Sequence, residues 1–143
     1  MANILLIEDN VSSARLAIKV LERHGHNIRH VTTGLDGLQA AREFHPDLIL
    51  VDLGLPDLDG KVVALQLRRS LPTASVMIVA FTAQTGDKAR WLARAYGCDD
   101  FLIKPIDTRA FPDQIATLLR RIGIKQVASP ADESEPNETP SGK

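Results

Sequence analysis

Continuous apolar runs and segments with helical spacing alternate along the chain. The apolar runs are ILLI (4–7), LILV (48–51), VMIVAF (76–81) and FLI (101–103). Apolar residues in these runs follow one another without intervening polar positions, which is typical of strands covered on both faces of a sheet. A further segment, NIRHV (27–31), alternates and predicts an edge strand.

The segments between the runs predict helices. In the first, apolar residues recur at i, i+3, i+4 and i+7, and a glycine follows as a C-cap: Ala14, Ala17, Ile18, Leu21 and Gly25. The next three helices are expected at 34–44, 61–70 and 87–96. The last places one apolar face at Phe111, Ile115, Leu118, Leu119 and Ile122. Pro112 must either kink that helix or mark its start.

Regular alternation of strands and helices indicates an α/β domain with a parallel sheet and right-handed crossovers. The chain has 143 residues, 44% hydrophobic and 24% charged, which suits one domain with a real core. Residues 126–143, QVASPADESEPNETPSGK, are too polar to bury much surface. We therefore expect a domain at 1–125 and a disordered tail at 126–143, with no DNA-binding domain after it.

Composition excludes several classes of protein. A net charge of −1 gives no general attraction to nucleic acid or anionic membranes. The single cysteine, Cys98, cannot form a disulfide within the chain. The apolar runs are too short to span a bilayer, and the amino-terminal sequence does not read as a signal peptide. A cytoplasmic location is the expectation.

Polar side chains stand at the carboxyl ends of the predicted strands. They are Glu8, Asp9, Asp52, Thr82 and Lys104. Ligands of open α/β sheets bind at that edge. Carboxylates that converge there need a cation between them, and hard oxygen ligands suit Mg²⁺. Together with a lysine and a hydroxyl, they could hold a phosphoryl group on a carboxylate oxygen, and aspartate is a known phosphoryl acceptor.

Aspartates in these segments also have ordinary structural interpretations. Asp9 could N-cap the first helix. Asp57 and Asp59 follow Pro56 in a loop that starts the third helix, where capping and turn formation explain them. Asp52 differs because it ends a buried strand beside the acidic pair, so Asp52 is the predicted acceptor.

Four motifs in this order resemble the receiver domain of two-component response regulators. They are LLIEDN, DLILVDLGLPDLDG, VAFTA and GCDDFLIKP, and the resemblance covers about residues 2–123. It implies a flavodoxin-like (βα)5 fold, doubly wound, with a parallel sheet in strand order 2-1-3-4-5 and five flanking helices. It also implies that a histidine kinase or a histidine phosphotransfer protein donates the phosphoryl group to Asp52.

The resemblance further implies a metal site for Mg²⁺, with Mn²⁺ as a possible substitute. Glu8 and Asp9 match the acidic pair, with Asp9 as the expected direct ligand beside Asp52. The main-chain carbonyl of Gly54 would complete the protein's share of the ligands.

Thr82 and Lys104 match the residues that contact the phosphoryl oxygens, and the Lys104–Pro105 peptide is often cis in the family. Phe101 matches the switch aromatic, where tyrosine is common. The signal is expected to leave through a downstream protein, or through a homodimer, on the face formed by the fourth helix, the fifth strand and the fifth helix. Trp91 is expected to point outward on that face.

The expected protein is thus a response regulator acting as a chemotaxis-like effector or a phosphorelay intermediate. It would not be an enzyme for a separate substrate, although it would catalyse its own phosphorylation and dephosphorylation. One alternative is a receiver-like binding module that does not take phosphate. Another is an aspartate-nucleophile phosphatase of the haloacid dehalogenase kind, using DLD at 57–59, although those residues do not end the first strand.

Overall fold

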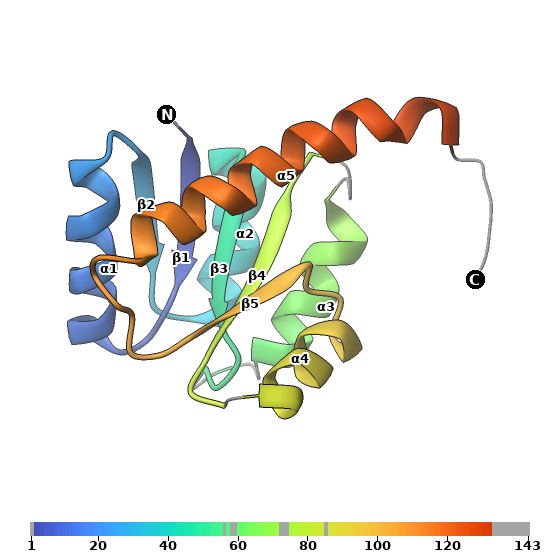
Figure 1. Cartoon of the computed structure of the whole chain (residues 1–143). Coiled ribbons are helices and arrows are strands. Elements are labelled where there is room, and N and C mark those ends of the chain that lie inside the picture. Colours follow the sequence, from blue (N-terminus) through green and yellow to red (C-terminus); the bar gives the residue numbers. More distant parts are fainter. Residues whose placement is uncertain (1, 56, 58–59, 72–74, 85, 133–143) are drawn as a thin grey trace.

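Five parallel strands form one sheet in the order β2-β1-β3-β4-β5, with helices on both faces (Figure 1). The structure is a computed structural model that describes residues 2–55, 57, 60–71, 75–84 and 86–132. The strands are β1 (Asn3–Ile7), β2 (Asn27–Val31), β3 (Leu48–Asp52), β4 (Met77–Thr82) and β5 (Asp100–Ile103). The predicted α/β class, strand order and edge position of 27–31 are all confirmed.

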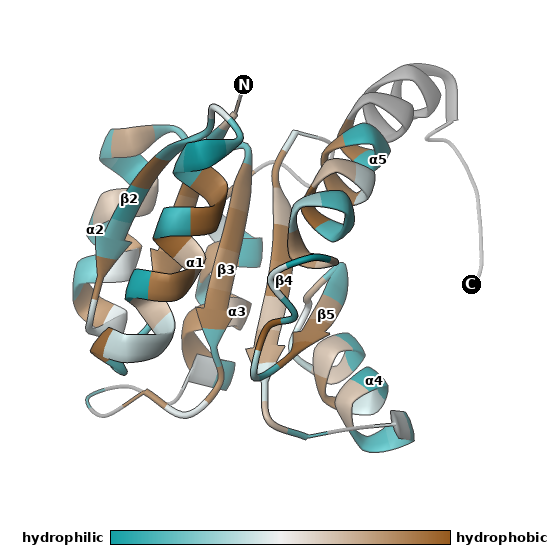
Figure 2. Cartoon of the chain, turned by 60° about the vertical axis from the view of Figure 1, so that its left-hand side comes forward, coloured by the Kyte–Doolittle hydropathy of each residue, from teal (hydrophilic) through white to brown (hydrophobic). Residues whose placement is uncertain are grey.

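Successive strand residues point to opposite faces, and both faces are covered. The helices are α1 (Val11–Arg23), α2 (Gly34–Phe44), α3 (Gly60–Ser70), α4 (Gly86–Ala95) and α5 (Phe111–Asp132). Apolar residues of α1 and α5 share one core cluster with Ile4 and Leu6, whereas α2 and α3 share another with Leu5 and Ile7. The central strands are apolar along their length for this reason (Figure 2).

Side-chain caps determine where the first two helices begin. Asn10 caps α1, because its side-chain oxygen accepts a hydrogen bond from Ser13 N at 2.9 Å. Thr33 caps α2 in the same way, accepting from Asp36 N at 3.1 Å. The interpretation of Asp9 as the cap of the first helix is therefore wrong, because the next residue has that role.

The last helix differs from the expectation at its far end. Pro112 is its second residue, so it marks the start of α5 and does not kink it. The helix continues to Asp132, although disorder was expected from residue 126. Extending a helix that is already packed on a sheet adds a hydrogen bond per residue without a new nucleation cost. The rest of the predicted tail, 133–143, lies outside the described residues.

Two consecutive aspartates anchor β5 to helices in different layers. Arg68 of α3 forms an ion pair with Asp99 and donates from Nε to the Gly97 carbonyl at 3.1 Å. Asp99 also accepts from Ile78 N of β4 at 2.8 Å. Arg121 of α5 forms an ion pair with Asp100. The last strand is thus held from both sides of the sheet.

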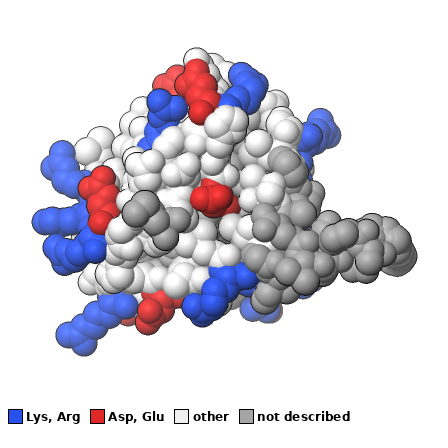
Figure 3. All heavy atoms as spheres, turned by 90° about the horizontal axis from the view of Figure 1, so that it is seen from above, with Lys and Arg blue, Asp and Glu red and all other residues white. Residues whose placement is uncertain are grey.

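The surface shows charges of both signs. Viewed from above, lysine and arginine side chains lie mainly around the rim, with acidic side chains between them and near the centre (Figure 3). This mixture agrees with the net charge of −1. Among the described residues, no helix is long and apolar enough to cross a membrane.

Candidate functional site

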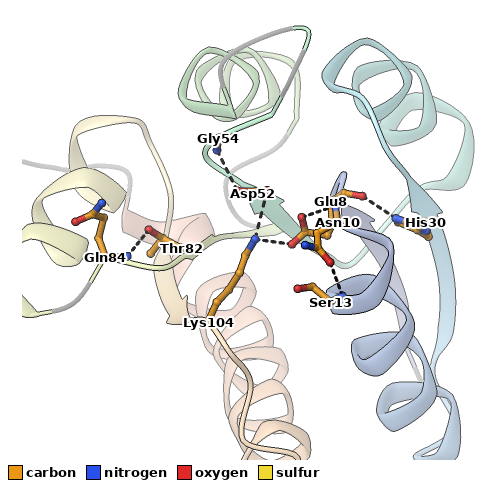
Figure 4. Close-up of polar contacts among 9 residues, drawn as sticks. All are labelled: Glu8, Asn10, Ser13, His30, Asp52, Gly54, Thr82, Gln84 and Lys104. Atoms are coloured by element: carbon orange, nitrogen blue, oxygen red, sulfur yellow. Dashed lines mark hydrogen bonds and ion pairs between the residues drawn. The ribbon is translucent and has the colours of Figure 1, made fainter.

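Side chains from four strand ends meet at the carboxyl edge of the sheet (Figure 4). The register pairs Asp52 with Phe81 and Thr82 with Ile103, so neighbouring strands end side by side. Glu8 directly follows β1, and Lys104 directly follows β5. Consequently the sheet brings Glu8, Asp52 and Lys104 into contact from distant parts of the chain.

Glu8 is completely buried, with 0% of its surface exposed. Its Oε1 lies 2.6 Å from Lys104 Nζ, an ion pair without the geometry of a hydrogen bond, and its Oε2 accepts from Asn10 N at 3.0 Å. Burial raises the pKa of Glu8, and the nearby Asp52 adds to this, although Lys104 and the Asn10 amide oppose it. The ion pair with Lys104 is therefore central to keeping Glu8 charged.

Asp52 has the opposite electrostatic balance. Burial alone would raise its pKa, but a hydrogen bond from Gly54 N at 3.0 Å and the charge of Lys104, at 3.3 Å from Oδ2, outweigh it. The pKa of Asp52 is thus lowered. For Lys104, burial would lower the pKa, but Glu8 and Asp52 raise it. An ionised aspartate beside a protonated lysine is the stable arrangement at neutral pH.

The acidic residues could hold a divalent metal ion. Glu8, Asp9 and Asp52 each offer a carboxylate oxygen, and these atoms lie within 4.8 Å of one another. Carboxylates together with water are the ligands that Mg²⁺ prefers. Asp9 is exposed, so an ion could reach it from solvent. The chemistry of these three oxygen donors therefore fits the predicted cation.

A cavity of about 370 Å³ opens beside Asp52. Thr82, which is 6% exposed, lines it together with Lys104, and its Oγ1 accepts from Gln84 N at 3.0 Å. Two further lysines, Lys61 and Lys88, also line the cavity and were not singled out from the sequence. The sequence could have indicated both lysines, because residues in the first turn of a helix that follows a parallel strand lie at the carboxyl edge of the sheet.

The loop after β3 returns directly onto the acceptor. A Cβ atom on Gly60 would lie 1.9 Å from the Asp52 carbonyl oxygen and 2.4 Å from Leu53 Cα, so only glycine fits where α3 begins. Asp57 caps a helix, but the helix is α2 and not the third helix, which its loop precedes: Gly34 N and Leu35 N both donate to its carboxylate. Asp59 lies outside the described residues.

The expected switch and exit residues lie on the α4–β5 side. Phe101 is partly buried against a cluster that includes Ala80 and Leu92. Trp91 is 63% exposed on α4, as expected, whereas Ala89, Leu92 and Ala93 of the same helix are buried. The Lys104–Pro105 peptide is cis.

Comparisons with known proteins agree with this architecture. Residues 4–132 match the family model described as the response regulator receiver domain. The transcriptional regulatory protein AfsQ1 of Streptomyces coelicolor is 37% identical over 85% of this chain, which spans 52% of that relative. The chain thus covers about half of AfsQ1. By contrast, it covers 95% of the polar-differentiation response regulator DivK of Brucella ovis, at 33% identity over 82% of this chain.

Solved structures give the same picture. The signal receiver domain of a putative Luxo repressor protein from Vibrio parahaemolyticus has a TM-score of 0.77 and 28% identity, covering 90% of this chain and 97% of that one. The chemotaxis response regulator CheY4 of Vibrio cholerae, at 20% identity, supports the fold, with a TM-score of 0.77 over 82% of this chain and 98% of that one. The chain belongs to the response regulator receiver domain family.

Proposed function

We propose that this chain is a phosphoaccepting receiver that takes a phosphoryl group onto Asp52 from the phosphohistidine of a histidine kinase or phosphotransfer protein. The observation that carries the proposal is the contact of Lys104 Nζ with Asp52 Oδ2 at 3.3 Å, where Asp52 belongs to a group of three carboxylates that could share one cation. This arrangement provides an ionised oxygen nucleophile and a positive charge next to it.

The reaction follows from these residues. An Asp52 carboxylate oxygen attacks the phosphorus, the phosphorus–nitrogen bond breaks, and the imidazole of the donor leaves and takes up a proton. The lowered pKa of Asp52 keeps the nucleophile ionised. Lys104 would then bind a phosphoryl oxygen, and the Thr82 hydroxyl would bind another. Mg²⁺ held by Glu8, Asp9, Asp52 and the Gly54 carbonyl would supply neutralisation of the phosphoryl charge.

The proposed output is a change of conformation that partner proteins recognise. Single-domain relatives support an output of this kind: the chain covers 98% of protein PilH of Pseudomonas aeruginosa, at 29% identity over 83% of this chain. The exposure of Trp91 and the position of Phe101 beside α4 support the face formed by α4, β5 and α5 as the proposed contact. The donor's kinase domain would meet the receiver in the cytoplasm.

Labelling with acetyl phosphate tests the proposal directly. The wild-type protein with Mg²⁺ should form a hydroxylamine-sensitive acyl phosphate, and Asp52→Asn should form none while keeping its circular dichroism spectrum. Normal labelling of Asp52→Asn would show that another residue accepts the phosphate. No labelling of the wild type would favour a phosphate-independent binding module, and steady release of phosphate from a phosphomonoester would favour a phosphatase.

A further inference from the structure

Asp57 joins two segments that are distant in the sequence. Its Oδ1 accepts a hydrogen bond from Gly34 N at 2.8 Å, and its Oδ2 accepts from Leu35 N at 3.2 Å. Both amides belong to the first turn of α2, where main-chain N–H groups lack partners within the helix and the helix dipole favours a negative charge. One carboxylate of the loop after β3 therefore holds the start of α2.

The same loop carries part of the proposed metal site. Gly54 N donates to Asp52 Oδ1 at 3.0 Å, and the Gly54 carbonyl is the proposed main-chain ligand. Leu53 and Leu55 are buried, each 7% exposed, and Gly60 packs against the Asp52 backbone. Asp57 adds an attachment on the side of the loop that faces α2.

That attachment leads back to the other half of the metal site. The start of α2 packs closely on β1, since a Cβ on Gly37 would lie 2.5 Å from Ile7 Cδ1. Ile7 directly precedes Glu8 and Asp9. Asp57 thus connects the β3 side of the site, with Asp52 and Gly54, through α2 to the β1 side.

We propose that Asp57 is a positioning residue for the divalent cation. Asp57 fixes the loop after β3 on α2, so that the Gly54 carbonyl and the carboxylates of Glu8 and Asp9 share one ion. The inference rests on the proposed function, because it concerns the same site. It does not require Asp57 to contact the ion, since Asp57 belongs to the same loop as Gly54 and acts by holding that loop on α2.

Thr33 provides a matched control. It caps the same helix by accepting from Asp36 N at 3.1 Å, but it directly precedes α2 and does not belong to the loop. Loss of either cap should weaken the start of α2, whereas only loss of Asp57 releases the loop.

The test is calorimetric titration of the unphosphorylated protein with Mg²⁺ alone. Asp57→Ala should weaken Mg²⁺ binding about tenfold, at the lower end of the effect of residues that support metal ligands. Thr33→Ala should leave the Mg²⁺ affinity within about twofold, even if it lowers the urea midpoint as much as Asp57→Ala does. A neighbouring residue changes metal affinity through the ligands that it supports, and Thr33 supports none of the proposed ligands. Asp57→Asn keeps one acceptor for Gly34 N and should fall between the two.

Amide hydrogen exchange gives a second readout. Saturating Mg²⁺ should slow exchange at Gly34 and Leu35 in the wild type more than at Asp36, whose partner is Thr33.

Equal Mg²⁺ affinity of Asp57→Ala and wild type would overturn the inference, as would an equal loss in Thr33→Ala. If Asp57→Ala does not fold, unchanged Mg²⁺ affinity of Asp57→Asn together with unchanged exchange at Leu35 would overturn it. Absence of Mg²⁺ binding in the wild type would overturn the metal part of the proposed function and this inference together. Loss of acetyl phosphate labelling with Mg²⁺ binding intact would contradict the proposed function alone.

Discussion

Lys104 Nζ lies 2.6 Å from Oε1 of the fully buried Glu8, and this ion pair joins the end of β5 to the end of β1. Removing one partner of a buried pair leaves a charge without compensation, which is more costly than the pair itself. Lys104 therefore has a structural role besides the proposed contact with a phosphoryl group.

Lys104→Met should lower the free energy of unfolding by about 3 kcal/mol at pH 7 in urea denaturation. The loss should shrink on acidification, because the pKa of Glu8 is already raised by burial and the acid becomes neutral as pH falls through that raised value. The double variant Lys104→Met, Glu8→Gln should recover most of the loss. A penalty that stays the same from pH 7 to pH 4 would contradict this explanation.

Asp9→Asn tests the proposed metal ligand that is open to solvent. We expect Mg²⁺ affinity to fall at least about tenfold, because one carboxylate of the cluster is lost. Without metal, the exposed position of Asp9 limits the relief of repulsion, so the free energy of unfolding should change by no more than about 0.5 kcal/mol. Unchanged Mg²⁺ binding in calorimetry would remove Asp9 from the site.

Trp91 provides a fluorescence probe on α4, since it is the single tryptophan of the chain. Adding beryllofluoride with Mg²⁺ should change its emission if a phosphoryl group at Asp52 alters this face, and Asp52→Asn is the control that should not respond.

Trp91→Ala should leave phosphorylation within about twofold and weaken a phosphorylation-dependent association by roughly 1–2 kcal/mol, in the range of interface anchor residues. If every such association were unaffected, α4 would not be the output face.

His26 should make stability depend on pH near neutrality. Burial and nearby positive charge lower its pKa from the ordinary 6.5, and its Nδ1 lies 3.3 Å from Ala2 N, which suits a neutral ring as acceptor. The unfolded chain then takes up the proton first, so this contribution is complete above pH 6.5 and is lost as pH falls through that value toward the lowered pKa. The stability difference between wild type and His26→Asn in urea should therefore shrink from pH 7.5 to 5. A constant difference would show that the ring is not held neutral.

The strands and the central site were predictable because they depend on local patterns. Continuous apolar runs identify buried strands, and a parallel sheet brings their carboxyl ends to one edge, so Glu8, Asp52 and Lys104 could be placed together from the sequence. The choice between Asp9 and Asn10 as the cap of α1 could not be made, since both residue types cap well.

Long-range contacts were less accessible. Asp57 is recognisable as a loop aspartate that caps a helix, but the amides that donate to it lie 23 residues earlier in the chain for Gly34 and 22 for Leu35. No local sequence pattern indicates that a loop after one strand will contact the start of a helix that follows another strand. The extension of α5 was missed for a related reason, because composition describes the segment in isolation and not as the continuation of a packed helix.

The anchoring of β5 determines which parts of the face formed by α4, β5 and α5 can move. Arg68 holds the Gly97 carbonyl just past the end of α4 and pairs with Asp99, while Arg121 holds Asp100 from the other layer. A displacement that started at Thr82 would reach α4 at its opposite end, which begins at Gly86. The helix would then rotate about its end near Gly97, so its first turn would move farther than Trp91.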